Sequence, residues 1–389
     1  MPKTATPSTP DASWNSTSRR RLSRSRAPDS SKGVARMGIR PWSVGAISCF
    51  PASSSCTHIS RKCYAYCEIV CHITVTSYQR RMTRMPHTPP SRTVEILSDA
   101  RYVQAESPRW DGRDGSLAWI DMATGALHRG RIEQGRVVPE TAVVVGAQIG
   151  APIPLAQRGA GWAVGVDRRV VHVSDDGVVT PLTDDIAGPG DYMNDGGGDP
   201  FGRFWVGSQS MPRDPHCTLW SLGPDGVPIA RLGGVTVSNG LAFDRTGSTL
   251  YYIDTLPHRS IEAFDVAPDG DLSNRRTVCR VSGGNPDGMA IDRDGMLWVA
   301  VWDAAEVRRY SPEGELVETI ALPAKRPTAV ALVDTLLVIT TASIGLAEPG
   351  DADGALLGVR VEVGGSPAFP WGGPSPLSDA GRAAEEAIL

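Results

Sequence analysis

Four residues with oxygen donors in their side chains recur along the chain at related intervals, namely Glu106, Asn194, Asn239 and Asp287. They stand in the motifs Glu-Ser-Pro-Arg-Trp, Asn-Asp-Gly, Ser-Asn-Gly-Leu and Asn-Pro-Asp-Gly-Met. Their separations of 88, 45 and 48 residues are one or two steps of a unit of roughly 40 to 50 residues, which is the period of propeller blades. If every unit brings its residue to the same height on a common axis, the four side chains converge. This spacing predicts a metal site.

The oxygen donors of this set indicate which chemistry the site could perform. Carboxylate and amide oxygens suit hard divalent cations such as Ca²⁺, Mg²⁺ or Mn²⁺, although Zn²⁺ also accepts Asp and Glu. Three protein ligands leave positions open for water and substrate, as in catalytic sites. Such a cation polarises a carbonyl oxygen and acidifies bound water, while a neighbouring carboxylate takes the proton. The residues favour hydrolysis of an ester-like bond with one divalent metal ion as cofactor, and leave open which carboxylate is the base.

A turn is the alternative interpretation of these motifs. Taken singly, an Asn or Asp followed by Gly is more typical of a turn than of a ligand. The phase that Asn194, Asn239 and Asp287 share with Glu106 favours a ring of ligands instead. We expect Asp195 to be a turn or capping group.

The elements that must position the four residues are short strands. From Val94 onward, apolar or alternating runs are separated by Asp-Gly and Gly-Gly turns, which is typical of β-strands joined by hairpins. One bulky residue per run recurs at intervals of 43, 43, 47, 46 and 40 residues: Trp119, Trp162, Trp205, Tyr252, Trp298 and Val338. Six copies predict an all-β fold, a six-bladed β-propeller whose tryptophans fill the core between blades.

A second set of residues precedes the bulky ones by about 10 to 14 positions: Glu106, Ala151, Asn194, Asn239, Asp287 and Thr328. Because the innermost strand of every blade lines the channel, equivalent positions form a ring. The two small members are expected to leave room for a substrate. Since an open propeller would expose a strand edge, residues 93–97 are predicted to pair with residues 355–361 and close the ring.

The chain changes character near Pro89 and Pro90. Residues 1–92 hold 15 Lys and Arg and 3 acidic residues, a net charge of +12, so the charge of −4 on the whole chain leaves −16 on residues 93–389. The first segment is rich in Ser and Arg and lacks apolar periodicity, which predicts a disordered N-terminal extension before a propeller domain of residues 93–389. The alternatives are an organelle transit peptide and a natural start at Met82 or Met85.

Composition also restricts the partners of residues 93–389. Their net charge of −16 argues against nucleic acid. No apolar run approaches the ~18 residues of a membrane-spanning helix, so no membrane partner is expected. Only Cys217 and Cys279 lie in this part, which implies no disulfide framework and favours a cytoplasmic location. We expect a small-molecule substrate and a monomer or weak homo-oligomer.

The motifs resemble those of the regucalcin (senescence marker protein) and gluconolactonase family of six-bladed propeller lactonases. The most specific segment runs from Asn194 to Gly207, Asn-Asp-Gly-Gly-Gly-Asp-Pro-Phe-Gly-Arg-Phe-Trp-Val-Gly, and resembles the third-blade signature almost throughout. Ser238-Asn-Gly-Leu resembles the fourth-blade signature and Pro286-Asp-Gly-Met the fifth. Glu106-Ser-Pro-Arg-Trp is similar to the first-blade Glu-Gly-Pro-x-Trp, with Ser107 in place of Gly.

The resemblance implies a role for each ring residue. Glu106, Asn239 and Asp287 would be the metal ligands, and Asp287 would also be the catalytic base for the attacking water. Asn194 would orient substrate or water. The implied activity is metal-dependent opening of a sugar lactone, such as an aldonolactone like gluconolactone, and the lactone is then the partner.

Two departures from the family bear on the substrate. Tyr192 stands where family members often carry an Arg that holds substrate hydroxyls, so we expect it at the substrate position. No acid of the loop beginning at Ser210 matches a substrate-contacting acid of some members. The alternative functions are a non-enzymatic calcium-binding propeller and a metal-dependent aryl-ester or organophosphate hydrolase.

Overall fold

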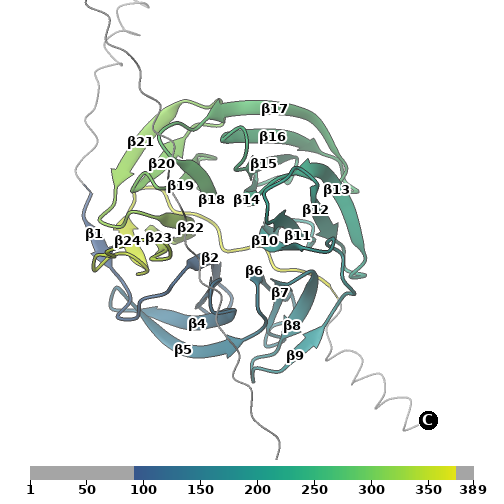
Figure 1. The fold of residues 1–389 in the computed structure, drawn as a ribbon, viewed down its shortest axis with the longest axis horizontal. Coiled ribbons are helices and arrows are strands. Elements are labelled where there is room, and N and C mark those ends of the chain that lie inside the picture. The colour runs from purple at the N-terminus through teal and green to yellow at the C-terminus, as the bar shows by residue number, and fades with distance from the viewer. Residues whose placement is uncertain (1–91, 374–389) are drawn as a thin grey trace, which may run out of the picture. The chain divides into compact units, whose positions relative to one another are not determined.

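The computed structural model describes residues 92–373, which belong to one of the two units of the chain, Pro86–Leu389. They form six four-stranded antiparallel sheets arranged as blades around a central channel (Figure 1). The predicted all-β, six-bladed β-propeller is confirmed. The N-terminal extension expected over residues 1–92 lies outside the described residues except for Arg92.

Each blade contributes four strands, which are named here from the channel outward. The innermost strands are β2 (Ala105–Asp111), β6 (Ile149–Pro154), β10 (Asp191–Gly198), β14 (Ser238–Phe243), β18 (Asn285–Ile291) and β22 (Pro327–Val333). The second strands are β3 (Ser116–Asp121), β7 (Trp162–Val166), β11 (Phe204–Ser210), β15 (Thr249–Asp254), β19 (Leu297–Trp302) and β23 (Leu336–Thr341). The third strands are β4 (Ala126–Glu133), β8 (Arg169–Val173), β12 (Cys217–Leu222), β16 (Ser260–Val266), β20 (Glu306–Tyr310) and β24 (Leu357–Arg360). The outermost are β5 (Arg136–Val144), β9 (Val179–Pro181), β13 (Pro228–Val235), β17 (Leu272–Arg280), β21 (Leu316–Ala321) and β1 (Val94–Ile96).

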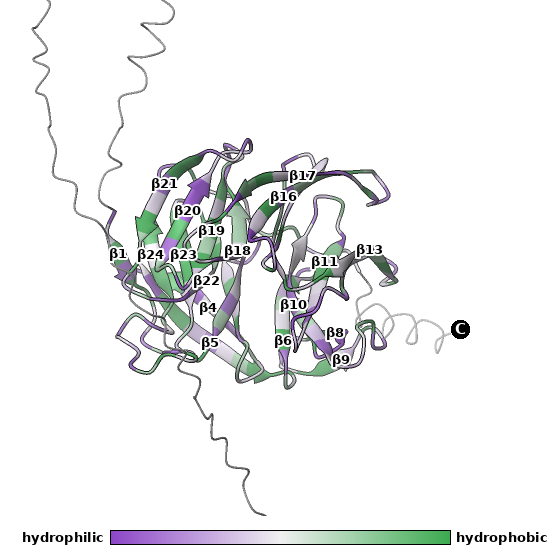
Figure 2. Ribbon diagram, turned by 45° about the horizontal axis from the view of Figure 1, so that its top comes forward, coloured by the Kyte–Doolittle hydropathy of each residue, from purple (hydrophilic) through white to green (hydrophobic). Residues whose placement is uncertain are grey.

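The hydrophobic core lies between the blades. The bulky residues predicted to recur once per blade all fall on the second strands, and Trp119, Trp205 and Trp298 are fully buried. Trp205, for example, packs against Leu241 and Tyr252 of the next blade. Figure 2 shows the apolar residues of β23 in green and the polar residues of β20 in purple. The tryptophans are core residues, as predicted.

The two ends of the propeller meet in one blade. β1 pairs antiparallel with β24, with Val94 opposite Val359 and Ile96 opposite Leu357. The sheet order β1-β24-β23-β22 makes the first strand of the chain the outermost strand of the sixth blade. The predicted closure of the ring is confirmed, and no described blade is left without its fourth strand.

A segment after β24 crosses the ring. Residues 361–373, yellow in Figure 1, run from the sixth blade across the centre toward β6 and β10. Gly365 bridges to Asp292, and Trp371 bridges to Leu155 and is fully buried. We call residues 361–373 the strap. No helix among residues 92–373 is long and apolar enough to cross a membrane.

Candidate active site at the mouth of the channel

A β-bulge in each innermost strand sets the direction of the ring side chains. The pairing register of every innermost strand with its neighbour shifts at the equivalent point, between Glu106 and Arg109 in β2 and between Pro286 and Met289 in β18. The other four shifts follow Ile149, Met193, Ser238 and Pro327. A bulge bends a strand and re-aims its side chains. The ring positions therefore leave the normal alternation of the sheet at the height where the channel opens.

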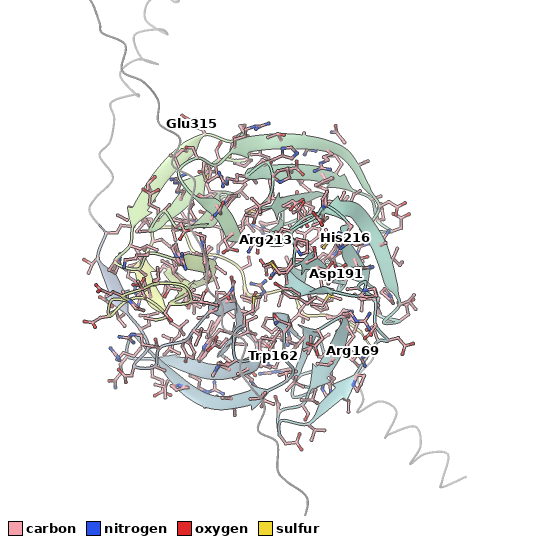
Figure 3. All side chains as sticks on the ribbon, in the orientation of Figure 1. Trp162, Arg169, Asp191, Arg213, His216 and Glu315 are labelled. Atoms are coloured by element: carbon pink, nitrogen blue, oxygen red, sulfur yellow. The ribbon has the colours of Figure 1, made fainter. Side chains whose placement is uncertain are left out.

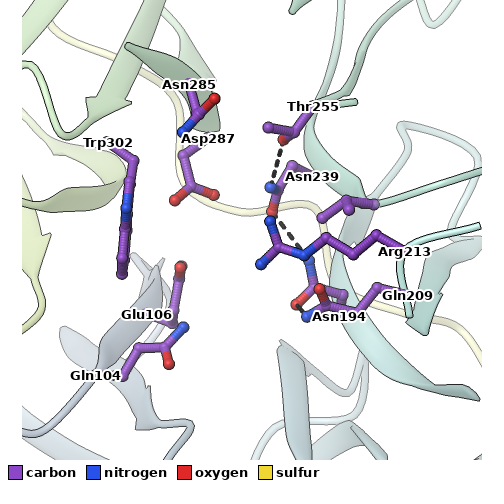
Figure 4. Close-up of a pocket in the computed structure, with 11 residues that line it drawn as sticks. Gln104, Glu106, Asn194, Gln209, Arg213, Asn239, Thr255, Asn285, Asp287 and Trp302 are labelled. Carbon is purple, nitrogen blue, oxygen red and sulfur yellow. Dashed lines mark hydrogen bonds between the residues drawn. The ribbon is translucent and has the colours of Figure 1, made fainter. Parts of the chain in front are cut away.

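The four oxygen-bearing ring residues line one cavity of about 130 Å³ (Figure 4). Glu106, Asn194, Asn239 and Asp287 are only 5 to 8% exposed. In Figure 4 the carboxylates of Glu106 and Asp287 face Asn239 across the cavity. The structure thus brings together the four residues that the sequence predicted to converge.

The glycine after a ring residue serves the contact between blades and not a turn. A Cβ atom on Gly288 would lie 2.6 Å from the Cα of Ala329 in β22, and a Cβ atom on Gly240 would lie 2.6 Å from the carbonyl oxygen of Asp287. Both glycines lie within strands. The turn interpretation of these Asn-Gly and Asp-Gly pairs is therefore wrong, because it is the close approach of adjacent innermost strands that requires glycine.

A chain of hydrogen bonds orients the amide of Asn239. Thr255 Oγ1 donates to the carbonyl oxygen of Pro286 at 2.8 Å, and so accepts a bond from Asn239 Nδ2 at 2.7 Å. This turns Asn239 Oδ1 toward Asn194 Nδ2, which donates to it at 3.0 Å. Gln209 Nε2 donates in turn to Asn194 Oδ1 at 2.7 Å. The amide oxygen of Asn239 keeps a lone pair directed into the cavity.

The two carboxyl groups of the cavity are held in an unfavourable environment for charge. Burial, followed by the negative charge of Asp195, raises the pKa of Glu106 from 4.5 to about 8. Burial, followed by the charges of Glu106 and Asp195, raises the pKa of Asp287 well above its ordinary value. Two buried carboxylates beside a pre-oriented amide oxygen are an oxygen donor set that a divalent cation fits, since its charge would offset the cost of ionising both.

Asp195 lies beside this donor set without belonging to the cavity lining. Its Oδ1 accepts a bond from Arg109 at 3.0 Å and one from Ser107 Oγ at 3.2 Å. It lies within β10 and pairs with a residue of β2, so the prediction of a turn or capping group is wrong for this residue. The Arg109 pair keeps the Asp195 charge compensated behind the site.

The cavity lining differs in part from the set of site residues that the sequence predicted. The remaining residues that line the cavity are Gln104, Gln209, Arg213, Val237, Thr255, Asn285 and Trp302. Tyr192 is half-buried and is not among them. Ala151 and Thr328 are fully buried and do not line it either, so their small size does not make room for a substrate. A search of the loop after Ser210 for basic as well as acidic residues would have found Arg213.

The fold and the position of the cavity define the class: a six-bladed β-propeller with a polar, acidic site at one mouth of its central channel. The chain belongs to the SMP-30/Gluconolactonase/LRE-like family, whose model matches residues 104–343.

Individual relatives agree with this placement. A Bacillus subtilis protein named provisionally as a sugar lactone lactonase is 31% identical, over 72% of this chain and 98% of its own length. The 6-deoxy-6-sulfogluconolactonase of Pseudomonas putida is 32% identical, over 62% of this chain and 83% of its own length. The calcium-binding protein regucalcin of Agrobacterium tumefaciens has the same fold, with a TM-score of 0.63 at 21% identity over 72% of this chain and 96% of that one. The family and these relatives place the chain among the lactone-hydrolysing enzymes.

Proposed function

We propose that this protein opens the ring of a sugar lactone with water activated by a divalent cation that Glu106, Asn239 and Asp287 hold. The observation that carries the proposal is the pair of buried carboxylates facing one oriented amide oxygen in a cavity open at the channel mouth. The names of the lactonase relatives support the reaction, and the name of the calcium-binding relative supports a divalent cation. A cytoplasmic location and a monomeric or weakly oligomeric state remain predictions.

The residues around the cavity divide the work of this reaction. When bound, the cation supplies a Lewis acid for the lactone carbonyl and acidifies a water molecule. Asp287, as the base, takes the proton of the attacking water. Asn194 donates through Nδ2 to Ser238 O at 2.6 Å and to Asn239, and its Oδ1 accepts a bond from Gln209 Nε2. The second lone pair of Oδ1 can accept a bond from a substrate hydroxyl.

The wall opposite the amides is aromatic. Trp302 lines the cavity, and the guanidinium of Arg326 lies 5.0 Å from the centre of its ring. Arg326 Nε forms an ion pair with Asp303 Oδ1 at 2.7 Å, and this pair holds the guanidinium over the indole. This rigid indole offers an apolar surface against which the C–H face of a sugar ring can pack.

Replacement of Asp287 tests the mechanism. We expect Asp287→Asn to lower kcat for lactone opening by roughly 10²- to 10⁴-fold, because the variant loses both a ligand and the general base. A pH-stat assay over a panel of neutral and acidic lactones, with calcium and with chelator, measures this loss. Glu315→Gln is the matched control, since Glu315 is an exposed carboxylate at the outer edge of the ring (Figure 3) and is expected to leave kcat unchanged.

The same assay decides between the candidate functions. Undiminished activity of Asp287→Asn, or full activity of the wild type in chelator, would refute the proposed mechanism. Faster hydrolysis of an aryl ester or a phosphotriester than of every lactone would favour the alternative hydrolase. Calcium binding without hydrolysis of any of these compounds would favour the non-enzymatic propeller.

A further inference from the structure

We propose that Arg213 selects a lactone that carries an anionic substituent, such as a carboxylate, phosphate or sulfonate, at the end remote from the ring carbonyl. The inference rests on the proposed function, because it assumes a divalent cation between Glu106 and Asp287. It adds a substrate class and a specificity residue to that function.

Arg213 is placed at the cavity by a short loop with internal order. Residues 211–216 connect β11 to β12, and Ser210 Oγ donates to the carbonyl oxygen of Pro212 at 2.7 Å. At the end of the loop, His216 Nε2 lies 2.8 Å from Oδ1 of Asp191, which is buried at the start of β10. Figure 3 shows Arg213 near the centre of the ring, whereas His216 lies farther out. The loop therefore extends inward over the channel mouth from a fixed base.

The guanidinium of Arg213 points into the cavity. In Figure 4 it lies beside the amide of Asn239 and points toward the side occupied by Asp287 and Trp302. Among residues 92–373, Arg213 has no carboxylate partner within ion-pair distance, in contrast to Arg109 with Asp195 at 3.0 Å. An arginine offers five N–H donors in a planar fork suited to oxyanions. This donor group is therefore available to a ligand.

The charges of the cavity give the sign of that ligand. Of the 11 lining residues only Glu106, Asp287 and Arg213 are charged. A divalent cation offsets the two carboxylates, and the charge of Asp195 behind them is already offset by Arg109. One positive charge then remains at the mouth. A neutral sugar lactone leaves it unmatched, whereas a lactone with one anionic substituent matches it.

The neighbours of Arg213 supply donors. Arg259 Nε donates to Asn285 Oδ1 at 2.7 Å, so the carboxamide oxygen of Asn285 is engaged and its NH₂ group is left for a ligand. Arg259 is exposed beside the mouth and adds a second positive charge there. An oxyanion at Arg213 would thus lie in a region of N–H donors, while the lactone carbonyl lies deeper, at Glu106 and Asp287.

Steady-state kinetics with three lactones tests the proposal. Glucono-1,5-lactone is the neutral probe, 6-phosphoglucono-1,5-lactone carries a phosphate, and glucaro-1,4-lactone carries a carboxylate. We expect the wild type to prefer one or both anionic lactones by kcat/KM. We expect Arg213→Gln to lower kcat/KM for the preferred lactone by about 10- to 100-fold, mostly through KM, and to change the neutral lactone by less than about threefold. Arg213→Lys should retain part of the preference.

A matched variant controls for general charge effects. Arg245 is exposed in the loop after β14, at the opposite end of that strand from Asn239, and Arg245→Gln removes the same charge from the molecule. It is expected to leave the preference intact. A preference lost equally in Arg245→Gln would contradict a specific role for Arg213, as would equal losses on all three lactones in Arg213→Gln.

Binding of the open-chain acids gives a readout that does not need turnover. Calorimetric titration of 6-phosphogluconate and glucarate into the calcium-loaded protein should show weaker binding to Arg213→Gln. The dissociation constant should be about 10- to 100-fold larger than that of the wild type. If the wild type hydrolyses neither these three lactones nor any other lactone of the panel, the proposed function fails. If it hydrolyses the neutral lactone best and Arg213→Gln binds both acids as well as the wild type, lactonase activity stands and the inference about Arg213 fails.

Discussion

The chemistry of the site depends on residues that are far apart in the sequence and meet only in the fold. Thr255 follows the second strand of the fourth blade, yet its hydroxyl fixes which atom of Asn239 enters the cavity. An amide turned the other way would present N–H groups to a cation and could not ligate it. Orientation by a neighbouring hydroxyl thus decides whether Asn239 is a ligand.

The raised pKa values at the site predict a dependence of stability on pH. In chelator, folding transfers Glu106 from a pKa of 4.5 to about 8, so between these values the folded protein binds more protons than the unfolded one. The free energy of unfolding should therefore fall as pH rises from about 4.5 to about 8, by at most about 1.4 kcal/mol per pH unit for one carboxyl group. Saturating calcium should flatten this slope.

Urea unfolding at pH 5.5 and pH 8, with chelator and with calcium, measures the effect. Glu106→Gln is the control, because it removes the carboxyl group. In chelator its free energy of unfolding should exceed that of the wild type at pH 8, and the two values should lie closer together at pH 5.5. A chelated wild type that gains stability relative to Glu106→Gln between pH 5.5 and pH 8 would contradict the prediction.

At this scale the sequence predicted the ring residues and missed their surroundings. Glu106, Asn194, Asn239 and Asp287 could be found because a repeated fold places equivalent positions together. Thr255 follows the end of β15 and Trp302 ends β19, outside the motifs of the ring, so only the structure shows that they line the cavity. Tyr192 was placed at the substrate by resemblance, but the cavity lining contains Gln209 and Arg213 from that blade instead.

At the scale of the element, the bulged innermost strand is the unit that makes the site. The sequence predicted the strands from their apolar runs, and the recurring tryptophans gave the number of blades. The bulges were not predictable in the same way, because one extra residue in a run of six to eight leaves its apolar character unchanged. The glycines next to Asn239 and Asp287 lie within these bulges, and a turn was the alternative interpretation of their motifs.

The contact between β18 and β22 predicts the effect of a single methyl group. In Gly288→Ala the new Cβ would meet the backbone of Ala329, which cannot rotate away, so the two blades must separate. We expect a loss of about 1 to 3 kcal/mol in the free energy of unfolding and weaker calcium binding, because Asp287 would shift with the strand. Urea unfolding and calcium titration measure the two effects.

Gly233→Ala provides the comparison for this variant. Gly233 lies in the outermost strand β13, has no atom within 4 Å of its Cβ position and has no left-handed backbone, so its replacement is expected to change stability by less than about 0.5 kcal/mol. Equal stability and equal calcium affinity of both variants would contradict the prediction, because they would mean that a methyl group at position 288 fits between β18 and β22.

At the scale of the whole propeller, β1 and the strap hold the ring from two sides. The pairing of β1 with β24 was predictable because closure is a general requirement of the architecture. The strap was not, since Gly-Gly-Ser-Pro-Ala-Phe-Pro-Trp, ending at Trp371, has neither strand nor helix periodicity. Its place depends on Trp371, whose Nε1 donates to the carbonyl oxygens of Leu222 and Gly223 at 3.1 Å.

Removal of the Trp371 side chain should destabilise the propeller. The indole packs with Phe204, with ring centres 6.1 Å apart, in the core between the second and third blades. We expect Trp371→Ala to lower the free energy of unfolding by about 3 to 5 kcal/mol, through the cavity that it leaves and the detachment of the strap. Trp371→Phe should lose less, because it keeps a ring in the core. A loss below about 1 kcal/mol in Trp371→Ala would show that the strap contributes little.

The strap also determines which end of the channel is open to a ligand. Ser366, Pro367, Ala368 and Phe369 line a pocket at the opposite end of the innermost strands from Glu106 and Asp287, so the strap lies over that end of the channel. We expect a lactone and the hydroxy acid made from it to pass through the mouth on the other side, beneath the loop of Arg213.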